Sequence, residues 1–127
     1  MPLAPYPRAV TVWLEAAARE VPERTFLAER AGDGWRTVAY GEALAIARRI
    51  GQALLDRGLS AERPVAILSD NGVDHALLML GALHVGVPLV PISPAYSLMS
   101  SDFAKLRHIA ALVQPGLVWC DDPARFG

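Results

Sequence analysis

Apolar residues recur along the chain at helical spacing, most clearly over residues 40–57. Steps of three and four residues place them on one stripe, which is the pattern of an amphipathic helix. The stripe consists of Tyr40, Leu44, Ala47, Ile50 and Leu54. Gly58 follows as the expected C-terminal stop, because glycine readily adopts the left-handed conformation that ends many helices.

Two further helices are predicted from capping residues and periodicity. The first spans residues 11–21, with Thr11 as its N-cap and Pro22 as its stop. The second begins at Ser100 or Ser101 and runs to about residue 113. Its predicted inward side chains are Phe103, Leu106, Ala110 and Val113.

Short apolar runs between these helices predict strands. Residues 65–68 have the continuous apolar pattern of a strand covered on both faces, and residues 88–92 predict a second buried strand. Residues 117–120 predict the last strand. Residues 25–30 and 35–38 predict a hairpin whose loop, 31–34, gains positive φ from its two glycines. From residue 40 onward helices and strands alternate, which favours a parallel sheet with right-handed crossovers. The predicted fold class is therefore α/β: a mostly parallel, Rossmann-like sheet with helices on both faces and an N-terminal β-hairpin.

The segment 73–85 has helical length but is apolar almost all round. Such a helix must be surrounded by other elements. A chain of 127 residues leaves little to cover its far side, and residues 121–127 are expected to carry no closing element. The sequence therefore predicts either a homo-oligomer formed through helix 73–84 or a part of a larger protein.

Composition excludes several function classes. The chain is 53% hydrophobic and 20% charged, which suits a packed core rather than disorder. Its net charge of −1 gives no basic footprint for nucleic acid. The apolar stretch 76–92 is interrupted by glycines and prolines and is too short to span a membrane, and residues 1–8 do not resemble a signal peptide. A single cysteine and no targeting segment fit a cytoplasmic protein.

The common nucleotide and hydrolase motifs are absent from the sequence. There is no GxxxxGK[ST] loop, no GxGxxG fingerprint and no GxSxG elbow. Gly32 and Gly34 lie in the predicted hairpin loop rather than between a strand and a helix. His75, His84 and His108 lack metal-ligand spacing, and His75 is interpreted as a helix-surface histidine.

Three other polar or reactive positions have ordinary interpretations. Residues 69–72 could begin a calcium loop, but Gly72 occupies a ligand position and no glutamate follows at the required distance, so a turn is predicted. Cys120 is interpreted as a buried small apolar residue. Arg48 and Arg49 are interpreted as a solvated helix face.

Two segments carry a resemblance to a known family. Residues 38–44, Val-Ala-Tyr-Gly-Glu-Ala-Leu, are similar to a core motif that reads roughly Leu-Thr-Tyr-x-Glu-Leu. Ala39 stands where a Thr or Ser would cap the helix, a loss of about 1 kcal/mol. Residues 83–86 and 91–94 are similar to a second motif, roughly Leu-Lys-Ala-Gly, four residues, then Pro-Leu-Asp-Pro, from which His84 and Ser93 depart. In this order and spacing the chain resembles the N-terminus of the adenylate-forming (AMP-binding) superfamily.

The resemblance implies that residues 1–127 are the incomplete N-terminal portion of an AMP-binding domain. The parent enzyme would be an acyl- or aryl-coenzyme A synthetase that uses ATP, Mg2+ and coenzyme A. Residues 93–98 and 102–108 are most similar to feruloyl-coenzyme A synthetases, which implies a hydroxycinnamate-type acid.

Both motifs are packing motifs, and the family's phosphate loop, acidic Mg2+ ligand and C-terminal lysine have no counterpart in this chain. No catalytic, cofactor-binding or metal residue is therefore carried over. The chain alone is expected to bind no cofactor and to be inactive, with the remainder of the enzyme as its partner. The alternative is a free-standing, non-enzymatic α/β binding or oligomerisation module.

Overall fold

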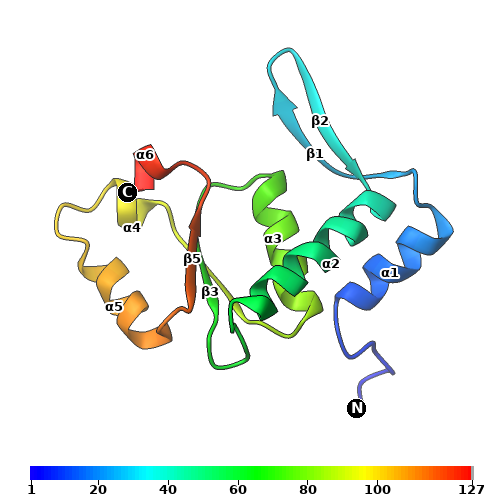
Figure 1. Ribbon diagram of the computed structural model, residues 1–127, viewed down its shortest axis with the longest axis horizontal. Helices are drawn as coiled ribbons and strands as arrows, with labels where there is room; N and C mark the ends of the chain where they lie inside the picture. The colour runs from blue at the N-terminus through cyan, green and yellow to red at the C-terminus, as the bar shows by residue number, and fades with distance from the viewer. Residues whose placement is uncertain (127) are drawn as a thin grey trace.

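The computed structural model describes residues 1–126, in which helices and strands alternate after an N-terminal hairpin (Figure 1). The elements are α1 (Thr11–Glu20), β1 (Thr25–Ala31), β2 (Gly34–Ala39), α2 (Tyr40–Asp56), β3 (Val65–Leu68), α3 (Val73–His84), β4 (Leu89–Ile92), α4 (Ala95–Leu98), α5 (Ala104–Val113), β5 (Leu117–Cys120) and α6 (Pro123–Phe126). No helix of the described residues is long and apolar enough to cross a membrane.

The strands form two separate sheets. β4, β3 and β5 make a parallel sheet in that order, and β1 pairs with β2 in an antiparallel hairpin. Helices α2 and α3 lie on one side of the parallel sheet, and α4, α5 and α6 lie on the other (Figure 1). The predicted α/β class, parallel sheet and hairpin are confirmed. In the hairpin loop the positive φ falls on Gly32 alone, because Gly34 already belongs to β2.

The central strand is the only strand buried along its whole described length. Val65 and Ile67 pack toward α2 and α3, while Ala66 and Leu68 pack toward α4, α5 and α6. The prediction of coverage on both faces is confirmed for β3, and the predicted burial of β4 is wrong. Both β4 and β5 are partly exposed edge strands. Pro91 in β4 is exposed, as expected for a residue that cannot donate to a sheet ladder.

Glycines return the chain from α2 and from α3 to the sheet. Gly58 and Gly86 have φ of 74° and 72°, and each follows the last turn of its helix. The amide of Leu59 donates to the carbonyl of Leu54, and the amide of Val87 donates to that of Ala82. This six-to-one bond defines a Schellman ending, and in both cases the two bonded residues are buried in one cluster. The predicted stop at Gly58 is thereby confirmed.

Helices α2 and α3 approach each other at two glycines. A Cβ on Gly81 would lie 2.5 Å from Ile50 Cγ2, and a Cβ on Gly51 would lie 2.7 Å from Val85 Cγ1. Neither position has room for a methyl group. The helices therefore pack closely, with the side chains of Ile50 and Val85 directly against the glycine backbone opposite them.

The predicted uncovered face on helix 73–84 is wrong. Leu77 and Leu80 pack with Leu14 of α1 and Val38 of β2, while Leu78 packs toward the sheet. None of the large hydrophobic side chains of α3 is among the exposed ones in residues 1–126. Elements distant in sequence supply the cover, so homo-oligomerisation through this helix has no support.

Two helix starts differ from the prediction. Thr11 is buried as the first residue of α1, and Val10 takes the N-cap position without a side-chain bond. α5 begins at Ala104 rather than at Ser100 or Ser101, because Phe103 adopts a left-handed conformation with φ of 55°. Ser100 Oγ and Asp102 Oδ1 accept hydrogen bonds from the amides of Phe103 and Ala104, so the serine supports the turn instead of the helix.

Of the predicted inward side chains of α5, Leu106 and Val113 are partly buried, whereas Phe103 and Ala110 are exposed.

The missing cap at Ala39 is replaced by backbone groups. Ala39 is the N-cap of α2, and its side chain makes no capping bond. The amides of Tyr40 and Gly41 instead donate to the carbonyls of Arg24 and Pro22, both at 3.0 Å. The turn before β1 therefore satisfies two of the four amides that a helix start leaves open.

Two four-residue helices, α4 and α6, were not predicted. α6 contradicts the expectation of no closing element after β5. Asp122 Oδ1 accepts a 2.9 Å hydrogen bond from the amide of Ala124, and Phe126 packs against Ala66 and Leu68. The last described turn of the chain thus closes one end of the sheet.

Gly81→Ala tests the close contact between α2 and α3. In an open helix this change would stabilise by up to about 1 kcal/mol, because alanine has the higher helix propensity. Here the methyl group meets Ile50, so we expect a loss of about 1–3 kcal/mol in the free energy of unfolding, measured by urea denaturation. Gly34→Ala is the control, since its Cβ would meet only the Ala31 carbonyl at 3.9 Å. Equal stability of the two variants would contradict the contact.

Candidate functional site

The topology of the sheet creates a crevice at the carboxyl ends of β3 and β5. After β3 the chain turns into α3 on one side of the sheet, and after β5 it turns into α6 on the other (Figure 1). In α/β sheets, ligands bind where neighbouring strands diverge in this way. A hollow of about 180 Å³ lies there, lined by Glu29, Ser69, Asp70, Asn71, Gly72, Asp74, His75, Trp119 and Asp121.

A serine and a histidine brace the turn at the end of β3. Ser69 Oγ donates to the carbonyl of Asp70 at 2.9 Å and lies 2.9 Å from His75 Nδ1. Nδ1 is also 3.3 Å from that same carbonyl oxygen, which can only accept. All three contacts are compatible when Nδ1 donates to Ser69 Oγ and to the Asp70 carbonyl. His75 is therefore a half-buried brace of the turn rather than a free helix-surface histidine.

The hairpin supplies the cap of α3. Gly72, at the N-cap, has no side chain, and Glu29 Oε2 accepts a 2.7 Å hydrogen bond from the amide of Val73. Glu29 also accepts a hydrogen bond from Arg36 Nη1 at 3.1 Å, and Arg36 Nη2 donates to Asp74 Oδ1 at 2.7 Å. The bond to Arg36 lowers the pKa of Asp74, and it raises the pKa of Arg36. One carboxylate thus joins the hairpin to the positive end of the helix dipole.

A second arginine joins the two loops of the crevice. Arg125 of α6 donates to Asp70 Oδ2 at 2.9 Å, and this bond raises the pKa of the guanidinium. The bond runs from the loop after β5 to the loop after β3. Both ions are about half exposed, so its contribution to stability is small.

The crevice is lined mainly by groups that accept hydrogen bonds. Four of its residues carry carboxylates, and Arg36 and Arg125 neutralise part of their charge. No group of three or more His, Cys, Asp and Glu side chains in residues 1–126 is arranged to hold a metal ion. At about 180 Å³ the hollow is smaller than the usual ligand pocket of about 300–1,000 Å³. The crevice has the size and polarity expected of one wall of a larger site.

The histidines that the sequence offered do not meet. His75 and His84 stand at opposite ends of α3, and His108 lies on α5 across the sheet. His84 Nε2 lies 3.9 Å from Glu15 Oε1 of α1.

The turn at residues 69–72 is confirmed, and Arg48 and Arg49 are exposed as predicted. Cys120 is half-buried rather than fully buried.

The crevice residues with specific partners were missed by the sequence analysis. Ser69 and His75 are six positions apart and flank a turn, which is a local signal that could have been found. Glu29 and Val73 are 44 positions apart, and no spacing rule connects them.

Residues 14–124, which run from α1 to α6, match the AMP-binding enzyme family. The chain belongs to this family. This AMP-binding family member is 29% identical over 113 residues to the nonribosomal peptide synthetase CymA of Salinispora arenicola, covering 87% of the chain and 1% of CymA. Its fold is similar to that of the Legionella pneumophila fatty acyl-adenylate ligase solved with acyl adenylate and pyrophosphate: TM-score 0.77 and 21% identity, with 88% of this chain and 19% of that one covered. A Mycobacterium tuberculosis fatty acyl CoA synthetase gives TM-score 0.74 and 21% identity, with coverage of 88% and 21%.

These comparisons establish the family and the fold. The AMP-binding chain spans only a small part of each of the three proteins. The three proteins include a peptide synthetase, an acyl-adenylate ligase and a coenzyme A synthetase. The narrower resemblance to feruloyl-coenzyme A synthetases is therefore not confirmed by them.

Glu29→Ala tests the cap on α3. We expect a loss of about 1–2 kcal/mol in the free energy of unfolding, because the Val73 amide loses its acceptor. Glu29→Gln keeps an acceptor oxygen and should lose less. Hydrogen exchange at the Val73 amide should accelerate in Glu29→Ala and stay slow in a control, Glu23→Ala, on the exposed turn before β1. Unchanged exchange at Val73 in Glu29→Ala would show that the bond does not protect this turn.

Proposed function

We propose that residues 1–127 are the N-terminal portion of the AMP-binding domain of a cytoplasmic, ATP-dependent acid–coenzyme A ligase. The family match over residues 14–124 carries this proposal. The two resembling motifs also take structural positions in the fold. Residues 83–86 form the Schellman end of α3, and residues 91–94 span the end of β4 and the start of α4.

The reaction of such an enzyme has two stages. A carboxylic acid is first joined to AMP from ATP, with release of pyrophosphate, and coenzyme A then displaces AMP to form a thioester. Both stages place negative charge on phosphoryl or acyl oxygens, which a protein must stabilise with donors or cations.

The described residues do not fit the phosphates of ATP. The start of α3 is the natural anion site of the crevice, and the Glu29 carboxylate already occupies it. Asp70, Asp74 and Asp121 add further negative charge at the same edge. The role proposed for this chain is therefore architectural: it forms one flank of the domain, and the phosphate-binding residues belong to the rest of the enzyme.

The proposed substrate is an aromatic, hydroxycinnamate-type acid. Its support is the resemblance of residues 93–98 and 102–108 to feruloyl-coenzyme A synthetases. In the structure these segments form α4 and the first turns of α5 with the bend before it.

The activity is tested by ATP–pyrophosphate exchange. A longer polypeptide that carries this chain at its N-terminus should catalyse exchange that depends on an added carboxylic acid, on ATP and on Mg2+. The 127-residue chain should give only the blank rate, because it lacks a phosphate site. Exchange by the short chain would overturn its architectural role, and no exchange by the longer polypeptide with any acid would overturn the ligase proposal.

The acid is identified by a thioester assay of the longer polypeptide. Ferulate, coumarate and caffeate should give coenzyme A thioesters at a higher kcat/KM than octanoate or palmitate. Replacing coenzyme A with buffer should leave adenylate formation but no thioester. Activity confined to long-chain fatty acids would contradict the aromatic substrate and leave the ligase class intact.

A further inference from the structure

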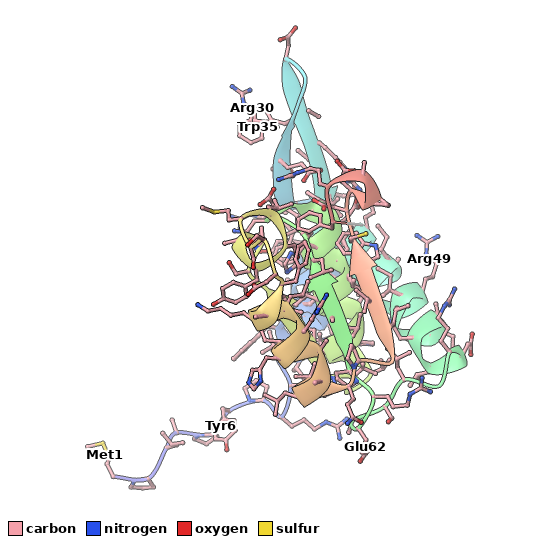
Figure 2. All side chains as sticks on the ribbon, turned by 90° about the vertical axis from the view of Figure 1, so that its left-hand side faces the viewer. Met1, Tyr6, Arg30, Trp35, Arg49 and Glu62 are labelled. Carbon is pink, nitrogen blue, oxygen red and sulfur yellow. The ribbon has the colours of Figure 1, made fainter. Side chains whose placement is uncertain are left out.

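Exposed apolar side chains gather on the side of the sheet that carries α4 and α5. Large apolar residues with at least a third of their surface exposed there are Leu98, Met99, Phe103, Leu112 and Val118. Figure 2 looks onto this side of the molecule. We call these five residues and helix α5 the α5 face.

The two sides of the sheet are packed to very different degrees. α2 has four buried residues and α3 has six, whereas α5 has none in ten. The side chains of α5 that pack against the sheet cluster are the partly buried Leu106 and Ile109. Two hollows of about 380 and 370 Å³ meet at Tyr96 and Lys105 beside it. A helix held by so few buried side chains needs further tertiary contacts, because most helical stability in proteins comes from packing.

The charged side chains of helix α5 are cationic, and the carboxylate of Asp102 lines the same hollow as Lys105. Lys105 and Arg107 form no ion pair with a carboxylate in the described chain. Lys105 Nζ lies 5.2 Å from the centre of the Tyr96 ring, so its ammonium rests on an aromatic face instead. A complementary surface would be apolar at its centre and polar at its rim.

The position of the last described turn indicates which segment supplies the surface complementary to the α5 face. α6 lies beside α4, and Phe126 packs into the same cluster as Leu106 and Ile109 (Figure 1). Chain that continued past this turn would start next to the α5 face. β5 also has no strand on its outer side within residues 1–126. The two solved proteins compared above are about five times as long as the part matched by this chain.

We propose that the α5 face is an intramolecular interface, covered in the complete enzyme by the segment that follows residue 127. The inference rests on the proposed function, in which this chain is the N-terminal portion of a longer domain. The covering segment is apolar at its centre, and it buries Leu112 and Val118. The hollows beside Tyr96 are closed by its side chains.

Thiol labelling of the longer polypeptide tests this interface. In a Cys120→Ser background, Leu112→Cys and Val118→Cys each place one thiol on the α5 face. Arg49→Cys is the matched control, because Arg49 is exposed on the polar side of α2, across the sheet. We expect a charged maleimide to label the two α5-face thiols at least about tenfold more slowly than the thiol of the Arg49→Cys control in the folded protein, and all three at similar rates in urea.

Each outcome decides one claim. Labelling of both α5-face thiols as fast as the control would overturn the interface. Protection of only one would also overturn it, since the proposed segment covers both. ATP–pyrophosphate exchange is measured on the unlabelled Cys120→Ser protein, so a protected but inactive protein would refute the ligase proposal alone. An active protein with freely labelled thiols would refute the interface alone.

Discussion

The close packing of α2 against α3 at Gly51 and Gly81 is the constraint on which the other elements depend. The helix pair separates two apolar clusters. One cluster joins it to α1 and the hairpin, and the other joins it to the sheet. A wider spacing between α2 and α3 would disturb both clusters, because Leu77 of α3 belongs to the first and Leu78 to the second. The Schellman turns at Gly58 and Gly86 then return the chain toward β3 and β4 from a pair whose spacing is already fixed.

The elements that the sequence predicted well are those whose signal is local. Residues 40–56 show a helical stripe, residues 65–68 a continuous apolar run, and Gly32 a tight turn. The coverage of α3 could not be predicted in this way, because Leu14 and Val38 reach it from distant parts of the chain. α4 and α6 are four residues long, too short to show any period.

The candidate site was less predictable than the fold for the same physical reason. A glycine at the N-cap of α3 indicates only that no local side chain caps the helix. The Glu29 carboxylate that replaces the cap comes from a hairpin whose sequence carries no sign of this partner. The bond from Arg125 to Asp70 likewise joins residues 55 positions apart. The resemblance seen in the sequence was carried by packing motifs, which explains why the fold is well specified while no reacting group is identified in this chain.

The joint between the hairpin and α3 has a mechanical consequence. The hairpin projects beyond the body of the molecule, and Arg30 stacks on Trp35 toward its tip, far from the apolar clusters (Figure 2). In the register pair next to Arg30 and Trp35, Glu29 and Arg36 hold the first turn of α3. A load on the tip would therefore act through a lever arm of a few residues and be delivered to the amide of Val73. The force would pass next to the turn at Ser69–Gly72. A displacement of the hairpin tip would therefore move the carboxyl edge of the sheet.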